Sequence, residues 1–166
     1  MINKENFINE SKLAKIIQSS CSHIVNIKDE SFQYCNGLII VNCTYDLDLV
    51  IQKLFKVGAI SNYKNWLSNK THDFKAMTEC EKEVPADLTG YLKMNGNKLS
   101  YVFKIGNRFI SYKKDFIDLF ENVEFKAADG MELPNLRVYG DGNLIGIICP
   151  IRESHDLLAE IQVGQV

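Results

Sequence analysis

The sequence predicts an α+β domain in which antiparallel sheets carry their helices on one side. Apolar residues recur at helical spacing over residues 46–57 and again over residues 112–121. Much of the second half divides into short apolar stretches separated by Gly-containing turns, a pattern typical of antiparallel strands. The chain has 166 residues, of which 46% are hydrophobic and 24% charged, which is the size and balance of one globular domain.

The first element expected is a helix near residues 10–20, followed by a short alternating strand at 23–28. The cap of this helix and its apolar face, at i, i+3, i+4 spacing, are Asn9, Leu13, Ile16 and Ile17. Residues 1–36 therefore form an N-terminal helix and strand, which is either an extension or part of the main domain. The main domain is expected over residues 37–152.

A buried strand over residues 37–43 is expected next, because β-branched residues dominate there. The helix at 46–57 follows it. Its apolar stripe consists of Leu47, Val50, Ile51, Leu54 and Phe55. Gly58 stands where a left-handed residue would end this helix. Residues 59–90 are polar and irregular, so we expect loops with one or two short strands.

A three-stranded antiparallel meander should follow. Asn95-Gly96 is a turn signal, because both central positions of a type I′ turn need positive φ, and Gly106-Asn107 marks a second turn. The three strands are expected at residues 91–94, 98–105 and 108–111.

The second helix is expected over residues 112–121, with Ser111 as its cap and Phe116, Ile117 and Phe120 facing inward. Three further strands are expected at residues 123–128, 135–139 and 144–151. The two strong helices start at positions 46 and 112, which is 66 positions apart, and a strand precedes each. This spacing indicates two βαβββ-type halves.

The second half carries a series of residues in the order strand, capped helix and three strands, with an apolar run closed by Cys-Pro-Ile-Arg. These residues are Phe109, Ser111, Phe116-Ile117, Leu119-Phe120, Val123-Glu124-Phe125, Leu136-Arg137-Val138 and Ile147-Ile148-Cys149-Pro150-Ile151-Arg152. The series resembles the C-terminal half of a bacterial DNA polymerase sliding-clamp (beta clamp) domain, most clearly over residues 109–152. The resemblance implies a sliding-clamp-like fold and a role in DNA metabolism.

The chain also departs from that family. A replicative clamp has three such domains, whereas this chain has room for one, and Cys149 stands where the family usually has Met. Residues 153–166 continue as a tail with a short helix where clamps end. A single-domain, phage-encoded relative fits these differences. In clamps the C-terminal residues help line a pocket for short linear peptides, so the resemblance implies binding roles for Pro150 and Arg152.

The net charge of −2 is too close to neutral for a general nucleic-acid-binding surface or for a mimic of DNA. Weak duplex binding would depend on lysines flanking the two helices: Lys53, Lys56, Lys113 and Lys114. An alternative site, suited to single strands, is the aromatic and basic cluster of Lys64, Trp66, Lys70 and Phe74. We expect a protein partner more than either nucleic acid, and weakly a homo-oligomer, because single clamp domains leave sheet edges uncovered.

Five cysteines without paired spacing, and the lack of an N-terminal signal or a long apolar run, predict reduced thiols and no membrane segment. We therefore expect a cytoplasmic protein. Lysine greatly outnumbers arginine and asparagine is abundant, which suits an AT-rich genome such as that of a low-GC bacterium or its phage.

Short clusters of reactive residues have simpler interpretations than chemistry. Cys21-Ser22-His23 lacks an orienting third group, and Asp46-Leu47-Asp48 suits the first turn of a helix. Thr71-His72-Asp73 and Glu79-Cys80-Glu81 lack zinc-ligand spacing, and Gly140-Asp141-Gly142-Asn143 suits a hairpin. We expect no catalytic residues, no metal site and no cofactor.

The leading hypothesis is a non-enzymatic accessory protein of phage or mobile-element DNA metabolism that acts through protein or DNA contacts. A second is a phage-encoded inhibitor that binds a host defence nuclease, as anti-CRISPR proteins do, or a replication protein. A third, from another class, is a small enzyme of unknown chemistry, which the lack of a convergent acid, base or nucleophile disfavours.

Overall fold

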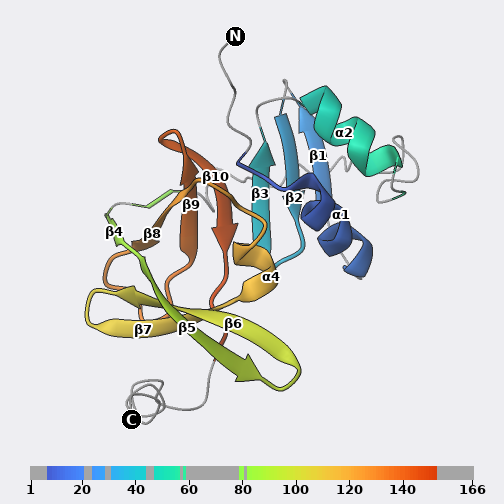
Figure 1. Ribbon diagram of the computed structural model, residues 1–166. Coiled ribbons are helices and arrows are strands. Elements are labelled where there is room, and N and C mark those ends of the chain that lie inside the picture. The colour runs from blue at the N-terminus through green and yellow to red at the C-terminus, as the bar shows by residue number, and fades with distance from the viewer. Residues whose placement is uncertain are drawn as a thin grey trace.

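The computed structural model describes residues 7–20, 24–28, 31–43, 47–56, 58, 79–80 and 82–152. Within them the chain forms two antiparallel sheets and a few short helices, so the predicted α+β class is confirmed. Figure 1 shows the smaller sheet crossing one end of the larger one.

Seven strands form the larger sheet in the order β1-β2-β3-β10-β9-β8-β4, and each runs antiparallel to its neighbours. Their bounds are β1 Ile24–Lys28, β2 Ser31–Cys35, β3 Ile39–Cys43, β4 Glu83–Pro85, β8 Glu124–Ala128, β9 Leu136–Gly140 and β10 Asn143–Ile148. The strand β2 was not predicted. It pairs with β1 and β3, so part of the N-terminal residues 1–36 lies in the same sheet as the C-terminal strand.

The smaller sheet is the predicted meander and has the order β5-β6-β7. Its strands are β5 Asp87–Asn95, β6 Lys98–Ile105 and β7 Arg108–Lys113. The first turn is displaced by one residue from the prediction, because Asn95 pairs with Lys98 and the loop is Gly96-Asn97. Gly96 takes the first loop position with φ of 61°, as a type II′ turn requires. Gly106-Asn107 forms the second loop as predicted.

The helices are α1 Glu10–Ser19, α2 Leu47–Lys56 and α4 Lys114–Ile117. The predicted N-terminal helix is confirmed, and the Asn9 side chain caps it by accepting a 3.1 Å hydrogen bond from the backbone N–H of Lys12. In Figure 1, α1 and α4 lie over the same face of the larger sheet. Their apolar side chains belong to one core with those of the strands beneath them.

Two units of similar order supply all the strands of the larger sheet except β4. In the first, α1 precedes β1-β2-β3; in the second, α4 precedes β8-β9-β10. The last strands of the two units join antiparallel at the middle, with Val41 opposite Gly146. The two units therefore begin at positions 10 and 114, and the predicted equivalence of the helices at 46 and 112 is wrong. α2 packs on α1 instead of heading a unit.

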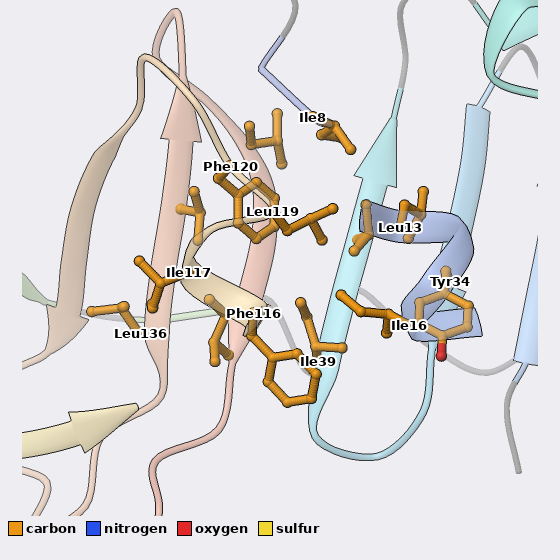
Figure 2. Packing of buried hydrophobic residues seen from close by; sticks show 14 of the residues in the cluster. Ile8, Leu13, Ile16, Tyr34, Ile39, Phe116, Ile117, Leu119, Phe120 and Leu136 are labelled. Atoms are coloured by element: carbon orange, nitrogen blue, oxygen red, sulfur yellow. The ribbon is translucent and has the colours of Figure 1, made fainter. Parts of the chain in front are cut away.

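The core lies between the larger sheet and the layer formed by α1, α4 and the smaller sheet. Figure 2 shows side chains from α1, β2, β3 and the α4 region directed toward one another. Ile8 and Phe120 form an antiparallel bridge that ties the segment before α1 to the segment after α4. Phe103 of the smaller sheet meets Phe125 of β8 edge to face at 5.2 Å, which joins the two sheets.

The predicted helix over 112–121 is wrong in its bounds, because only residues 114–117 are helical. The strand β7 continues to Lys113, and Ser111 lies in it rather than capping the helix. At the other end, Leu119 accepts a 2.8 Å backbone hydrogen bond from Asn9, and the chain turns there into the bridge at Phe120. Phe116, Ile117 and Phe120 are buried as predicted.

In α2 the predicted stripe holds for Val50 and Leu54, which are 1% and 0% exposed. Phe55 was predicted to face the core but is 59% exposed, so this prediction is wrong. Because Leu54 points into the core, Phe55, which is rotated by roughly 100° around the helix axis from it, points away from the core. Ile51 is half-buried, and the side chain of Leu47 lies outside the described part.

Candidate functional site: a cleft between the ends of the two sheets

The chain leaves the larger sheet after β10 and crosses to the smaller one. We call residues 149–152 the strap. Its backbone is held at both sheets, since the N–H of Cys149 donates to the Leu38 carbonyl at 2.8 Å and that of Ile151 to Ser111 at 2.9 Å. The predicted strand over 144–151 therefore ends three residues early, at Ile148, because the chain changes sheets.

A cleft of about 820 Å³ opens beside the strap. Its walls come from four places: the strap, the β2–β3 turn, the turn between β5 and β6, and the loop before β9. Phe116 and Lys113, at the start of α4, also line it. The volume is within the range of ligand-binding pockets, about 300–1,000 Å³.

The cleft has a strongly apolar character. Leu38 and Leu133 line it and expose 55% and 40% of their surface, although both are large hydrophobic residues. Pro150 and Ile151 are half-buried in its wall, and Phe116 is buried to 3%. Exposed apolar side chains that gather around a hollow are typical of a site that binds another molecule.

In the part of the chain that the structure describes, the charged side chains that line the cleft are all positive: Lys98, Lys113 and Arg152. The Lys113 ammonium lies 4.6 Å from the centre of the Phe116 ring and 3.5 Å from an Asp115 carboxylate oxygen. Lys98 and Arg152 are exposed. The cleft therefore offers an apolar surface with a cationic rim.

Cys149 is the one residue of the strap with nucleophilic chemistry. Its Sγ donates to the Gly37 carbonyl at 3.7 Å. Burial, with a smaller contribution from neighbouring Cys35, raises the pKa of its thiol. A raised pKa keeps the thiol protonated, and the thiolate is the reactive form. Cys149 is therefore a wall residue with low reactivity.

The structure brings three of the residues predicted to bind a partner into this cleft, namely Pro150, Arg152 and Lys113. Lys114 points elsewhere: it pairs with Asp118 and lies 5.1 Å from the Tyr101 ring centre. Lys114 therefore does not join the three cleft residues.

Lys53 and Lys56 lie on α2, apart from the cleft. Lys53 bonds Glu10 of α1 at 3.1 Å, and Lys56 is exposed. The four helix lysines thus do not form a single surface, because α2 packs on α1 whereas α4 packs on β6 and β7. The alternative cluster lies outside the described residues, and it consists of Lys64, Trp66, Lys70 and Phe74.

Sequence reasoning missed the residues that shape the opposite wall. Leu38 sits in the tight turn between β2 and β3, next to Gly37, whose φ is 85°. The sequence predicted Leu38 to lie in a buried strand over residues 37–43, but β3 begins at Ile39 and Leu38 is exposed in the turn before it. Leu133 precedes the buried Pro134 in a loop that carries no pattern pointing to the cleft.

A second polar cluster lies on the other face of the larger sheet. Glu83 of β4 pairs with Arg137 of β9 and accepts a 2.6 Å hydrogen bond from the Tyr139 hydroxyl. Burial acts to lower the pKa of Arg137, but the Tyr139 and Glu83 contacts leave it raised. The three side chains pair with one another. We therefore interpret the cluster as holding the edge strand β4 to β9, and not as a binding site.

Among the described ranges, no three His, Cys, Asp or Glu side chains gather as potential metal ligands. No helix of that part is long and apolar enough to cross a membrane. No protein-family model matches the chain, and no curated protein or solved structure matches it significantly.

Proposed function

We propose that this chain is a non-enzymatic accessory protein of phage or mobile-element DNA metabolism that binds a short segment of a partner protein in the cleft. The observation that carries the proposal is the position of Pro150 and Arg152. The resemblance to sliding clamps implies that these residues line a peptide pocket, and both line a cleft of suitable size here. The two helix-plus-three-strand units also support the resemblance, since clamp domains are built from such repeats.

The hydrogen bonding of the strap favours a partner segment that binds through its side chains, and not one that pairs with the strap as an added β-strand. The N–H groups of Cys149 and Ile151 are already bonded within the protein, and Pro150 between them has no N–H to donate. An incoming segment would find few backbone donors here. Apolar side chains of the partner would instead pack on Leu38 and Leu133, as anchor residues do at the centre of an interface.

The arrangement of the lysines favours a protein partner over DNA. Three of the four helix lysines lie within ion-pair distance of a carboxylate of this chain, so they would have to give up these partners to contact phosphates. These lysines also lie apart, because α2 packs on α1 whereas α4 packs on β6 and β7. Duplex binding that depends on phosphate contacts would then be weak and sensitive to salt.

The experiment compares two matched variants, Leu38→Asp and Leu92→Asp. Leu38 lines the cleft and is 55% exposed, whereas Leu92 on β5 is 53% exposed and is not a cleft residue. Partners are captured from an extract with the wild-type chain, purified and titrated against each variant. We expect Leu38→Asp to weaken binding by about tenfold or more, and Leu92→Asp to leave it nearly unchanged.

The identity of the partner decides the rest of the proposal. A replication or recombination protein that depends on Leu38 supports an accessory role, whereas a defence nuclease would favour the inhibitor alternative. Equal affinity of the wild type and Leu38→Asp for every purified partner would contradict use of the cleft. Tight, salt-resistant binding of duplex DNA by the wild type would contradict a protein-directed role.

A further inference from the structure

We infer that the cleft selects a peptide in which an apolar anchor adjoins a run of acidic residues, and that these acidic residues lie in the groove between α1 and α4. This inference rests on the proposed function, because it names the chemistry of the segment bound in the same cleft. It is carried by the continuity of three hollows around Lys113 and by the charges along them.

The cleft does not end at α4. A second hollow of about 290 Å³ shares Leu38, Lys113 and Phe116 with it and reaches the C-terminal end of α1 at Ser19. A third hollow of about 270 Å³ shares Lys113 and Ser19 with the second and runs between α1 and α4. Lys113 lines all three hollows, so a peptide that enters the cleft can continue past it into the groove.

The charges differ between the two ends of this path. Among the described residues no Asp or Glu lines the cleft, whereas Lys98 and Arg152 do. Within the described part of the chain neither of these two cations has a carboxylate partner. An uncompensated cation beside an apolar wall is best satisfied by a carboxylate that the ligand brings.

In the groove, Lys12, Lys15 and Lys113 face Asp115 and Asp118. The acidic side is already engaged, because Asp118 pairs with Lys114 and Asp115 lies 3.5 Å from Lys113. Lys12 donates to the backbone carbonyl of Asp118 at 2.8 Å. Lys15 of α1 is exposed and has no carboxylate partner among the described residues, so it is the groove cation most open to a ligand.

An acidic peptide suits this surface better than a nucleic acid does. Phosphates would also meet Lys15 and Arg152, but the cleft between them is lined by aliphatic side chains and by a buried Phe116 whose ring is not open for base stacking. A polyanion with a charge on every unit would leave these apolar walls unfilled. A peptide supplies apolar groups and isolated carboxylates together.

The test begins with a cellulose-bound array of random heptapeptides of balanced composition, probed with the labelled full-length chain. We expect bound peptides to be enriched in Asp and Glu on one side of a pair of apolar residues. Recovered peptides without this enrichment overturn the inference but leave the proposed function standing. If no peptide on the array loses its binding when the Leu38→Asp variant replaces the wild type as the probe, both the inference and the proposed function are overturned.

The strongest binding peptide is then titrated by fluorescence anisotropy. We expect Arg152→Glu and Lys15→Glu each to weaken binding by about fivefold or more, because each turns an attraction into a repulsion. The matched control is Lys104→Glu, an exposed lysine on β6 that lines none of the three hollows, and it should change binding less than about twofold. A peptide in which Lys replaces the acidic residues should bind the Arg152→Glu variant more tightly than the acidic peptide binds it.

Two results would overturn the placement of the acidic run. One is an unchanged affinity for Lys15→Glu, which would remove the groove from the path. The other is displacement of the peptide by a single-stranded oligonucleotide at equal concentration, which would assign the surface to nucleic acid.

Discussion

Replacement of Gly146 by alanine tests how closely the larger sheet packs on the segment after α4. Gly146 lies on β10 opposite Val41, and its missing side chain would point at the ring of Phe120. A Cβ at this position would lie 2.8 Å from Cε1 of Phe120 and 3.2 Å from Cε2, and closer still to Cζ. Ordinary carbon contacts are about 3.5–4.0 Å. Gly146 is not among the glycines with positive φ, so the backbone itself accepts alanine.

The ring of Phe120 cannot move without cost. The side chain is 6% exposed within the core, and the bridge to Ile8 fixes its backbone. Overpacking of this kind costs about 1–3 kcal/mol of unfolding free energy. A domain of this size loses about 2–4 °C in melting temperature for each kcal/mol, so we expect Gly146→Ala to melt roughly 2–12 °C lower.

The assay is urea unfolding of the wild type, Gly146→Ala, Phe120→Leu and the double variant. Each single variant should lower the midpoint without a change in slope, because surface exposed on unfolding stays the same. Leucine lacks the ring atoms that collide with the new methyl group. The double variant should therefore be more stable than the sum of the two losses predicts, by about 1 kcal/mol or more.

A second glycine separates this steric effect from a backbone effect. Gly142 has φ of 75° and nothing within 4 Å of an added Cβ. Gly142→Ala should cost about 1–2 kcal/mol through its left-handed backbone, and this loss should add independently to that of Phe120→Leu. The reasoning is refuted if the losses from Gly146→Ala and Phe120→Leu add to within about 0.5 kcal/mol.

Two further predictions concern buried polar groups. Glu83→Gln removes the charge that offsets Arg137, whose side chain is 8% exposed. We expect this change to lower the unfolding free energy, measured by urea titration, by about 1–3 kcal/mol. No loss of stability would mean that water already compensates the guanidinium charge. Burial raises the pKa of Tyr112, whose hydroxyl donates to the Pro134 carbonyl at 2.7 Å. The resulting stability is fully present below the unfolded pKa of about 10 and is lost as pH rises above it, so urea midpoints should fall less steeply in alkali for Tyr112→Phe.

Local signals in the sequence predicted those elements whose ends are set by nearby residues. The helix at residues 10–19 has its own cap in Asn9, and the loop Gly106-Asn107 joins strands that follow each other directly. The end of the second helix was not predictable in this way. It depends on Asn9, more than a hundred positions away, whose N–H donates to the Leu119 carbonyl beside the bridge between Ile8 and Phe120.

The same distinction applies to the site. Pro150 and Arg152 were singled out because they close a contiguous C-terminal pattern. Leu38 and Leu133 were not, because their role depends on which strands are neighbours in the sheet. The pairing of β3 with β10 joins segments more than a hundred residues apart, and no periodicity in a single sequence reports such a pairing.

The cleft follows from the way the two units of the larger sheet meet. Because β3 and β10 pair antiparallel at the middle, the loop at Leu38 lies beside the point where the chain leaves β10. The chain can then reach β7 only by crossing the end of the core, and Cys149 and Ile151 fasten it on either side of that crossing. Substitutions in the hollow beside the strap, such as Leu38→Asp, replace exposed side chains and leave this frame in place. Binding and stability should therefore respond to different residues, with Leu38 and Arg152 governing the first and Gly146 and Phe120 the second.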